Sequence, residues 1–361
     1  MRRLPVELQA EIVQYLDPRE LATVSTTAKG FQQLVTRLLY RHIVFHARSA
    51  KVHLQLERLF ITLISHVDDI APFVQHLDLD WDAGFSTGRG RRQRKAPLAS
   101  LLTHTLPHLK SLTYLAVGPR SNMAKILDLL TIPTLREFHC AAAGALDNGF
   151  LSHHPYLARL SLCTHSSADH VIFSFLGRLP QGLEYLRLSS ATRALDMMGR
   201  LPQGREAKLT RLDLRVINWW DRPDFLELLQ LLRESFFTVS CINVFGPWAK
   251  DFLTHTSTVT VGHVTRAGVP CFELRNIEYQ LPEILVGVAR LFPNVRTLDI
   301  LADRPFSYRD IARLVQATDG LQRVDRIVFP DGKAYSRTDA DDFEPLATRV
   351  EDYSHILWPG F

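Results

Sequence analysis

The chain has 361 residues, of which 46% are hydrophobic and 22% are charged. These are the proportions of an ordinary folded protein, and the length suffices for a large core. The 42 basic and 38 acidic residues leave a net charge of +4, which is too balanced for a nucleic-acid-binding surface over the whole chain. The four cysteines lie far apart and form no CxxC pair, which excludes a dense disulfide or zinc framework.

The first residues, MRRLPVELQAE, do not have the pattern of a signal peptide, because charges interrupt the stretch at once. No run of about 18 apolar residues is present, so we expect no membrane span. Together with the sparse cysteines, these features predict a protein of the cytoplasm, the nucleus or both.

The first 45 residues predict three short helices. Leu8, Ile12 and Leu16 recur every four residues, which is typical of an amphipathic helix, and Pro5 suits its first turn. The stretch Asp17-Pro18-Arg19-Glu20 predicts the start of a second helix, with Asp as the N-cap and Glu placed to cap back. A third apolar stripe follows at Phe31, Leu34, Val35, Leu38 and Leu39. Because three such helices bury little surface alone, we expect apolar side chains to remain for a partner.

The order of residues in this segment closely resembles the F-box motif. The resemblance is carried by Leu4, Pro5, Glu7, Ile12, Leu16, Asp17, Pro18, Leu21, Lys29 and Phe31. Residues 39–45, LYRHIVF, also resemble the end of many fungal F-box motifs. The resemblance covers residues 1–45 and implies a three-helix F-box.

An F-box binds the Skp adaptor protein, which links it to a cullin-RING ubiquitin ligase. Carried over by position, the resemblance implies that the Skp adaptor would contact Leu4, Pro5, Leu8, Ile12, Leu16, Leu21 and Val24. The alternative is a small helical cap that packs only on the chain's own repeats.

A short sequence pattern, here called the phrase, recurs beyond a predicted helical linker at residues 46–70. It begins with Pro and has apolar residues at its third, sixth and eighth positions. Its central positions 138, 160, 186 and 212 are 22, 26 and 26 residues apart, a period typical of solenoids. Amphipathic segments, such as 225–232 and 284–291, separate the phrases. This strand-plus-helix period resembles the leucine-rich repeat. We therefore expect an irregular α/β solenoid over residues 71–330, with a distorted middle near 259–274 and a cap at 331–361.

One residue in each phrase lies between two apolar strand positions and should point away from the stack. It is polar in every copy: Asp78, Thr113, His139, Ser161, Arg187, Asp213, Asn243 and Asp299. We predict that this column contacts a target protein, with Trp81, Trp219 and Trp220 after the strands as anchors. Ordinary hydration of outward strand residues and tryptophans that fill gaps between repeats are the alternatives.

Residues 88–95, GRGRRQRK, hold five basic side chains and no aromatic residue that would stack on bases. Such a run is compatible with a nuclear import signal, a contact with an acidic partner or nucleic acid, or a solvated insertion.

The sequence contains no P-loop, no GxGxxG, no GxSxG and no HExxH motif. We therefore expect no catalytic site, no metal and no cofactor. The predicted function is the substrate receptor of a Skp–cullin–F-box ubiquitin ligase, which would hold a target near the ubiquitin-charged conjugating enzyme. A non-degradative scaffold and a nucleic-acid binder that uses residues 89–95 are the alternatives.

Overall fold

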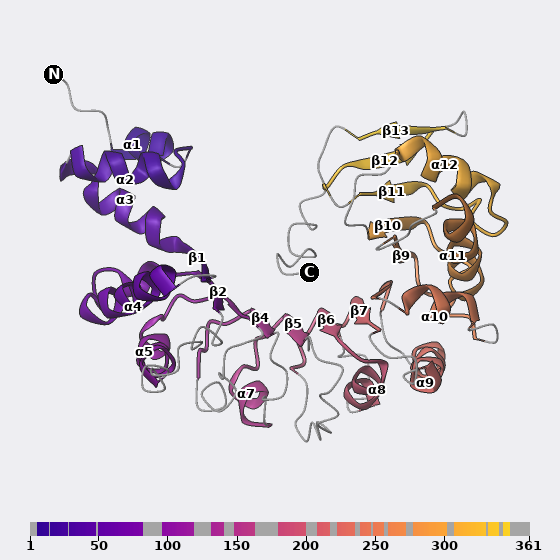
Figure 1. Ribbon diagram of the computed structural model, residues 1–361, viewed down its shortest axis with the longest axis horizontal. Coiled ribbons are helices and arrows are strands. Elements are labelled where there is room, and N and C mark those ends of the chain that lie inside the picture. Colours follow the sequence, from indigo (N-terminus) through magenta and orange to yellow (C-terminus); the bar gives the residue numbers. More distant parts are fainter. Residues whose placement is uncertain are drawn as a thin grey trace. The chain divides into compact units, whose positions relative to one another are not determined.

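The computed structural model describes residues 6–13, 15–27, 29–47, 50–81, 96–118, 131–140, 148–162, 180–199, 208–216, 222–234, 239–246, 248–255, 259–271, 277–301, 307–329, 331–338 and 342–346. The chain divides into two compact units, residues 1–165 and 166–361. Helices and strands alternate in both (Figure 1). The protein is therefore of mixed α/β class, with a long strand–helix series after an N-terminal helical region.

The first unit begins with helices α1 (Val6–Val13), α2 (Pro18–Thr27) and α3 (Lys29–Arg41). Helix α3 ends at Arg41, and the first strand begins at the next residue. The backbone N–H of Gln75 donates to the carbonyl of Arg41 over 3.0 Å, and the Arg37 guanidinium lies 4.9 Å from the centre of the Phe73 ring. The helical region is thus continuous with the strands of this unit and packs against them.

The strands of the first unit pair in parallel and in sequence order. The elements are β1 (His42–Ala47), α4 (Ala50–Ser65), η1 (Ala71–Phe73), β2 (His76–Trp81), α5 (Ala96–Thr105), η2 (Leu106–His108), β3 (Tyr114–Val117), β4 (Glu137–Cys140), α7 (Asn148–His153) and β5 (Arg159–Leu162). Helix α4, which we expected to be a linker, connects β1 to β2 and so belongs to the series.

The second unit continues the same alternation. Its elements are β6 (Tyr185–Leu188), α8 (Ala191–Gly199), β7 (Arg211–Arg215), α9 (Arg222–Glu234), β8 (Cys241–Phe245), α10 (Ala249–His255), β9 (Arg266–Pro270), α11 (Ile277–Leu291), β10 (Thr297–Leu301), α12 (Tyr308–Ala317), β11 (Arg326–Val328), β12 (Ala334–Arg337) and β13 (Phe343–Pro345). Strands β6 to β11 are parallel, whereas β12 and β13 are antiparallel additions. Helices α8 to α11 lie along one side of the strands (Figure 1).

The predicted register is correct in most copies and wrong in two. Leu77 lies opposite Leu115, three residues later than the predicted Leu112, and Leu298 lies opposite Ile327 instead of Val324. Leu112 and Val324 are also fully buried, but in the turn that precedes each strand. Apolar residues three positions apart occur both in the turn and in the strand that follows it, so their spacing alone does not show where the strand begins.

The expected distortion is wrong for residues 259–271, because β9 continues the parallel series, and residues 272–274 lie outside the described residues. Ala267 lies opposite Ile242 on one side and Leu298 on the other. The strand is hard to predict since Ala, Gly and Pro are poor strand formers. At Gly268 a side chain would have no room, since a Cβ would lie 2.6 Å from Oδ1 of Asn243.

Inward-facing strand residues and apolar helix faces form the cores. Phe138 packs on Phe150 with ring centres 4.4 Å apart, and Phe225 packs on Phe252 at 5.3 Å. All four side chains are fully buried. Within the described ranges, no helix combines the length and apolar character needed to traverse a bilayer.

Candidate functional site

Helix α1 has an apolar face that the chain itself does not cover. Leu8 is 46% exposed, Ile12 is 49% exposed, and Tyr15 in the following turn is 78% exposed. Leu8 and Ile12 are four residues apart, so their side chains are neighbours on one face of the helix. Adjacent large apolar side chains left in water are typical of a protein-contact surface.

A separate small core holds the three N-terminal helices together. Val13, Leu21 and Val35 are buried at its centre. The partly buried side chains around them are Leu16, Val24, Leu34, Leu38 and Leu39. Leu8 and Ile12 are not part of this core, so the core holds the three helices together without these two side chains.

The start of α2 has the predicted capping box. Oδ1 of Asp17 accepts hydrogen bonds from the backbone N–H groups of Arg19 and Glu20 over 2.8 and 2.9 Å. Oε2 of Glu20 accepts in return from the backbone N–H of Asp17 over 2.9 Å. This reciprocal pair fixes the turn between α1 and α2, and with it the direction from which the α1 face approaches a partner.

In the second unit, the side of the strands opposite the buried leucines forms a polar strand face. Successive strands align its side chains in two rows. The first row is Tyr185, Arg211, Cys241, Arg266, Thr297 and Arg326. The second row includes Arg187, Asp213, Asn243, Gly268 and Asp299.

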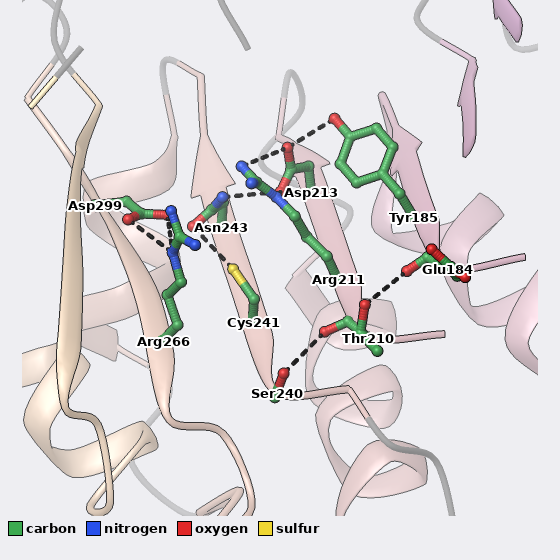
Figure 2. A network of polar contacts seen from close by, with 10 residues as sticks. All are labelled: Glu184, Tyr185, Thr210, Arg211, Asp213, Ser240, Cys241, Asn243, Arg266 and Asp299. Atoms are coloured by element: carbon green, nitrogen blue, oxygen red, sulfur yellow. Dashed lines mark hydrogen bonds and ion pairs between the residues drawn. The ribbon is translucent and has the colours of Figure 1, made fainter. Parts of the chain in front are cut away.

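Asp213 is the centre of one group of contacts on this face (Figure 2). It is 1% exposed and accepts from Nε of Arg211 over 3.0 Å, from the hydroxyl of Tyr185 over 2.9 Å and from Nδ2 of Asn243 over 2.9 Å. Burial, and then the charge of Asp213, raise the pKa of Tyr185 well above its ordinary value. Burial opposes the charge of Arg211, but Asp213 together with Cys241 and Tyr185 outweighs burial and raises the pKa of the guanidinium. The Arg211 side chain therefore stays charged through the physiological pH range.

Asp299 forms a second centre three strands away, on β10 (Figure 2). It is fully buried, and Nε of Arg266 lies 2.9 and 2.8 Å from its two carboxylate oxygens. Between the two centres, burial raises the pKa of Cys241 to about 12, so its thiol stays protonated and is no nucleophile. The charged side chains of these two centres are suited to the recognition of charge.

The corresponding face of the first unit is aromatic. The His76 and Tyr114 rings stack with centres 3.7 Å apart, and His42 and His139 lie at 5.3 Å from His76 and 5.1 Å from Tyr114. Nε2 of His139 lies 2.7 Å from a carboxylate oxygen of Glu137. Burial, then Arg41, lower the pKa of His42. In the part of the chain that the structure describes, no three His, Cys, Asp or Glu side chains are grouped to hold a metal.

The exposed face of α1 and the capping box that orients it lie in one short segment. Residues 1–46 match the F-box-like family model. No curated protein matches the chain. F-box-like regions are typical of proteins that bind the Skp adaptor, and such proteins are typically non-catalytic adaptors.

Within the F-box-like region, the described residues assigned to the Skp adaptor fall into three groups by exposure. Leu8 and Ile12 are exposed on α1, and Leu16 and Val24 are half-buried against the small core. Leu21 was expected to face the adaptor but is only 6% exposed, because its side of α2 forms the core with Val13 and Val35. Leu4 and Pro5 lie outside the described residues.

The residues assigned to target binding do not form the exposed column that we expected. His139, Arg187 and Asp213 are at most 2% exposed, while Asp78 is half-buried. They do point away from the leucines, but contacts with neighbouring strands cover them. Thr113 precedes strand β3, and Ala116 lies at its expected position opposite Asp78. The side chain of Trp81, both Trp219 and Trp220, and residues 88–95 lie outside the described residues.

The first-row arginines are the side chains that sequence reasoning undervalued. Arg211 was not among the predicted site residues, although its strand was predicted, and Arg266 was missed because β9 was not predicted as a strand. The sequence did contain a signal for β9. Val264 lies three residues before Ala267, just as Val295 lies three residues before Leu298 in the next copy.

Proposed function

We propose that this chain is the substrate-recognition subunit of a Skp–cullin–F-box ubiquitin ligase, acting in the cytoplasm or the nucleus. The α1 face would bind the Skp adaptor, and the strand–helix series, as a leucine-rich-repeat-like solenoid, would bind the target. The observation that carries the proposal is the exposure of Leu8 and Ile12 within the segment that matches the F-box-like family model.

The energetics of the α1 face support a partner. Full burial of a Leu or Ile side chain stabilises by about 1.5–3 kcal/mol, and these two are each about half exposed. Covering Leu8 and Ile12 together would thus contribute a few kcal/mol to association.

The ligase mechanism requires proximity and no catalytic group on this chain. A receptor that holds its target beside the conjugating enzyme raises the effective concentration of the reacting lysine. The junction of α3 and β1 supports this role, because Nε of Arg41 also donates to Oε1 of Gln75 over 2.9 Å. The helical region is therefore fastened to the strands of its own unit at several points.

Co-expression with the Skp adaptor tests the proposal. The double variant Leu8→Asp/Ile12→Asp should no longer copurify with the adaptor, because two carboxylates would be buried at the interface. The matched control is Leu54→Asp/Ile61→Asp on α4, where the two side chains are 53% and 48% exposed. The control should copurify like the unmodified chain. Undiminished copurification of the Leu8→Asp/Ile12→Asp variant would disprove the assigned interface.

Recovery of the cullin separates a ligase receptor from a scaffold. If the unmodified chain brings down both the Skp adaptor and the cullin, it acts as a ligase subunit. A complex with the Skp adaptor alone, under conditions in which other F-box proteins recover the cullin, would instead establish the non-degradative scaffold.

A further inference from the structure

The first row of the polar strand face places an arginine on every second strand. Arg211 is on β7, Arg266 on β9 and Arg326 on β11, while the intervening strands contribute the small residues Cys241 and Thr297. Neighbouring strands are about 4.8 Å apart, so successive arginines are roughly 10 Å apart. The row is thus a regular series of single positive charges.

Buried carboxylates hold two arginines of the first row in place, and all three arginines stay partly exposed to solvent. The buried carboxylates of Asp213 and Asp299, in the second row, fix Arg211 and Arg266 through the hydrogen bonds described above. The side chains of Arg211 and Arg266 nevertheless stay 13% and 25% exposed, and Arg326 is half-buried. An arginine already fixed by a carboxylate loses little rotamer freedom when a ligand binds, which favours affinity.

The polar strand face carries an excess of positive charge. Its described residues include five arginines and three acidic residues, which gives 5 − 3 = +2. The arginines are Arg187, Arg211, Arg215, Arg266 and Arg326, and the acidic residues are Asp213, Asp299 and Glu344, which continues the first row beyond Arg326 and Ser336. Of the exposed charged residues up to three positions before β6 to β11, Glu184 and Asp325 are acidic, and Lys208, Arg296 and Arg323 are basic. The face therefore attracts an anionic partner.

We infer that the first row binds an extended, acidic segment of a protein, with a carboxylate at every third residue. In the polyproline II conformation, which is extended, three residues make one turn and advance about 9 Å, so every third side chain lies on the same face at about the spacing of the arginines. The inference rests on the proposed function, because it makes this segment the part of the ubiquitination target that the receptor recognises.

The spacing favours a peptide over a nucleic acid. Phosphates of a nucleic acid strand follow one another about every 3.4 Å along a duplex, which is three times denser than the arginine row. The planar guanidinium fork suits a carboxylate, which it can bind through two parallel hydrogen bonds.

Peptide binding to the full chain, in complex with the Skp adaptor if that complex forms, tests the inference. The probe is a fluorescent peptide of Gly, Ser and Ala with Glu at positions 1, 4 and 7 of its acidic core. Fluorescence polarisation should show it binding about tenfold more tightly than a peptide with three adjacent Glu residues, since only the spaced peptide meets all three arginines. Equal affinity for the two peptides would overturn the inference. So would binding of a phosphoserine peptide or a single-stranded RNA where the spaced Glu peptide does not bind.

Two substitutions locate the site. Arg326→Gln should weaken the spaced peptide roughly tenfold, because it removes one of three charge-assisted contacts. Thr297→Glu should abolish binding, because it puts a negative charge between Arg266 and Arg326. Arg313→Gln makes the same charge change on the exposed side of α12 and should leave binding unaltered. An affinity that Arg326→Gln and Thr297→Glu leave unchanged in folded protein would disprove the assigned row.

The variant Leu8→Asp/Ile12→Asp keeps this test separate from that of the proposed function. It should lose the Skp adaptor and bind the spaced peptide with unchanged affinity, since the substitutions lie on α1 and leave the first row intact. Peptide binding that disappears with these substitutions would contradict a site on β7, β9 and β11.

Discussion

The N-terminal helices and the strands of the strand–helix series differ in which side chains they bury. The helices leave Leu8 and Ile12 about half exposed over a core of only three buried side chains. The strands bury their leucines completely and bury Asp213 and Asp299 as well. The strands therefore need no partner to cover their leucines, whereas the apolar face of α1 is left open to one. The following changes test this contrast, from the largest expected effect to the smallest.

Truncation of an apolar side chain should be costly in the series and nearly neutral on α1. Phe138→Ala should lower the free energy of unfolding by about 3–5 kcal/mol, because the side chain is fully buried against Phe150. Leu8→Ala should change it by less than about 0.5 kcal/mol, since Leu8 is outside the small core. Urea denaturation measures both. A loss of several kcal/mol for Leu8→Ala would mean that α1 uses this residue for its own stability.

The buried carboxylates should matter nearly as much as the apolar core. Asp299→Ala should lower the free energy of unfolding by about 3 kcal/mol, because it leaves the largely buried charge of Arg266 without its carboxylate. Asp319→Ala, which removes an exposed carboxylate in the turn after α12, should change it by less than about 0.5 kcal/mol. Similar results for the two variants would show that the polar strand face contributes nothing to stability.

A buried histidine should make the first unit sensitive to acid. Nδ1 of His154 donates to the carbonyl of Phe150 over 2.6 Å, and Nε2 accepts from the backbone N–H of Ile132 over 3.0 Å, so the neutral ring satisfies both contacts. Burial lowers the pKa of His154 below 6.5, hence the unfolded chain takes up the proton first. The stabilisation is complete above about pH 6.5 and falls as the pH drops below it, by at most about 1.4 kcal/mol per pH unit.

Unfolding measured at pH 7 and pH 5 tests the role of His154. The unmodified chain should lose more stability between these values than His154→Gln, whose side chain does not titrate. Equal losses would show that other groups account for the acid sensitivity.

The capping box should have the smallest effect on stability. Asp17→Ala should lower the free energy of unfolding of the helical region by about 1 kcal/mol, because two backbone N–H groups at the start of α2 lose their acceptor. Asp17→Asn keeps an acceptor of the same size and should be close to neutral. Chemical denaturation monitored on the helical region distinguishes the two.

Local patterns predicted the segments in which one physical signal dominates. The capping box is confirmed, because Asp, Pro and Glu at fixed spacing have few other uses. The amphipathic segments 225–232 and 284–291 are confirmed as parts of helices α9 and α11. The register failed at Leu112 and Val324, because buried turn residues and strand residues have the same spacing. The burial of Asp213 and Arg187 was unpredictable from the sequence, since it depends on which side chains the neighbouring strands bring alongside.

The affinity for the Skp adaptor, measured by calorimetry at several temperatures, tests the central claim most directly. If the adaptor covers the apolar face of α1, binding should show a negative heat-capacity change, and Leu8→Asp/Ile12→Asp should weaken it at least a hundredfold with little change in unfolding. Leu54→Asp/Ile61→Asp should bind like the unmodified chain. Equal affinities for the two double variants would contradict the claim that the exposed face of α1 awaits a partner.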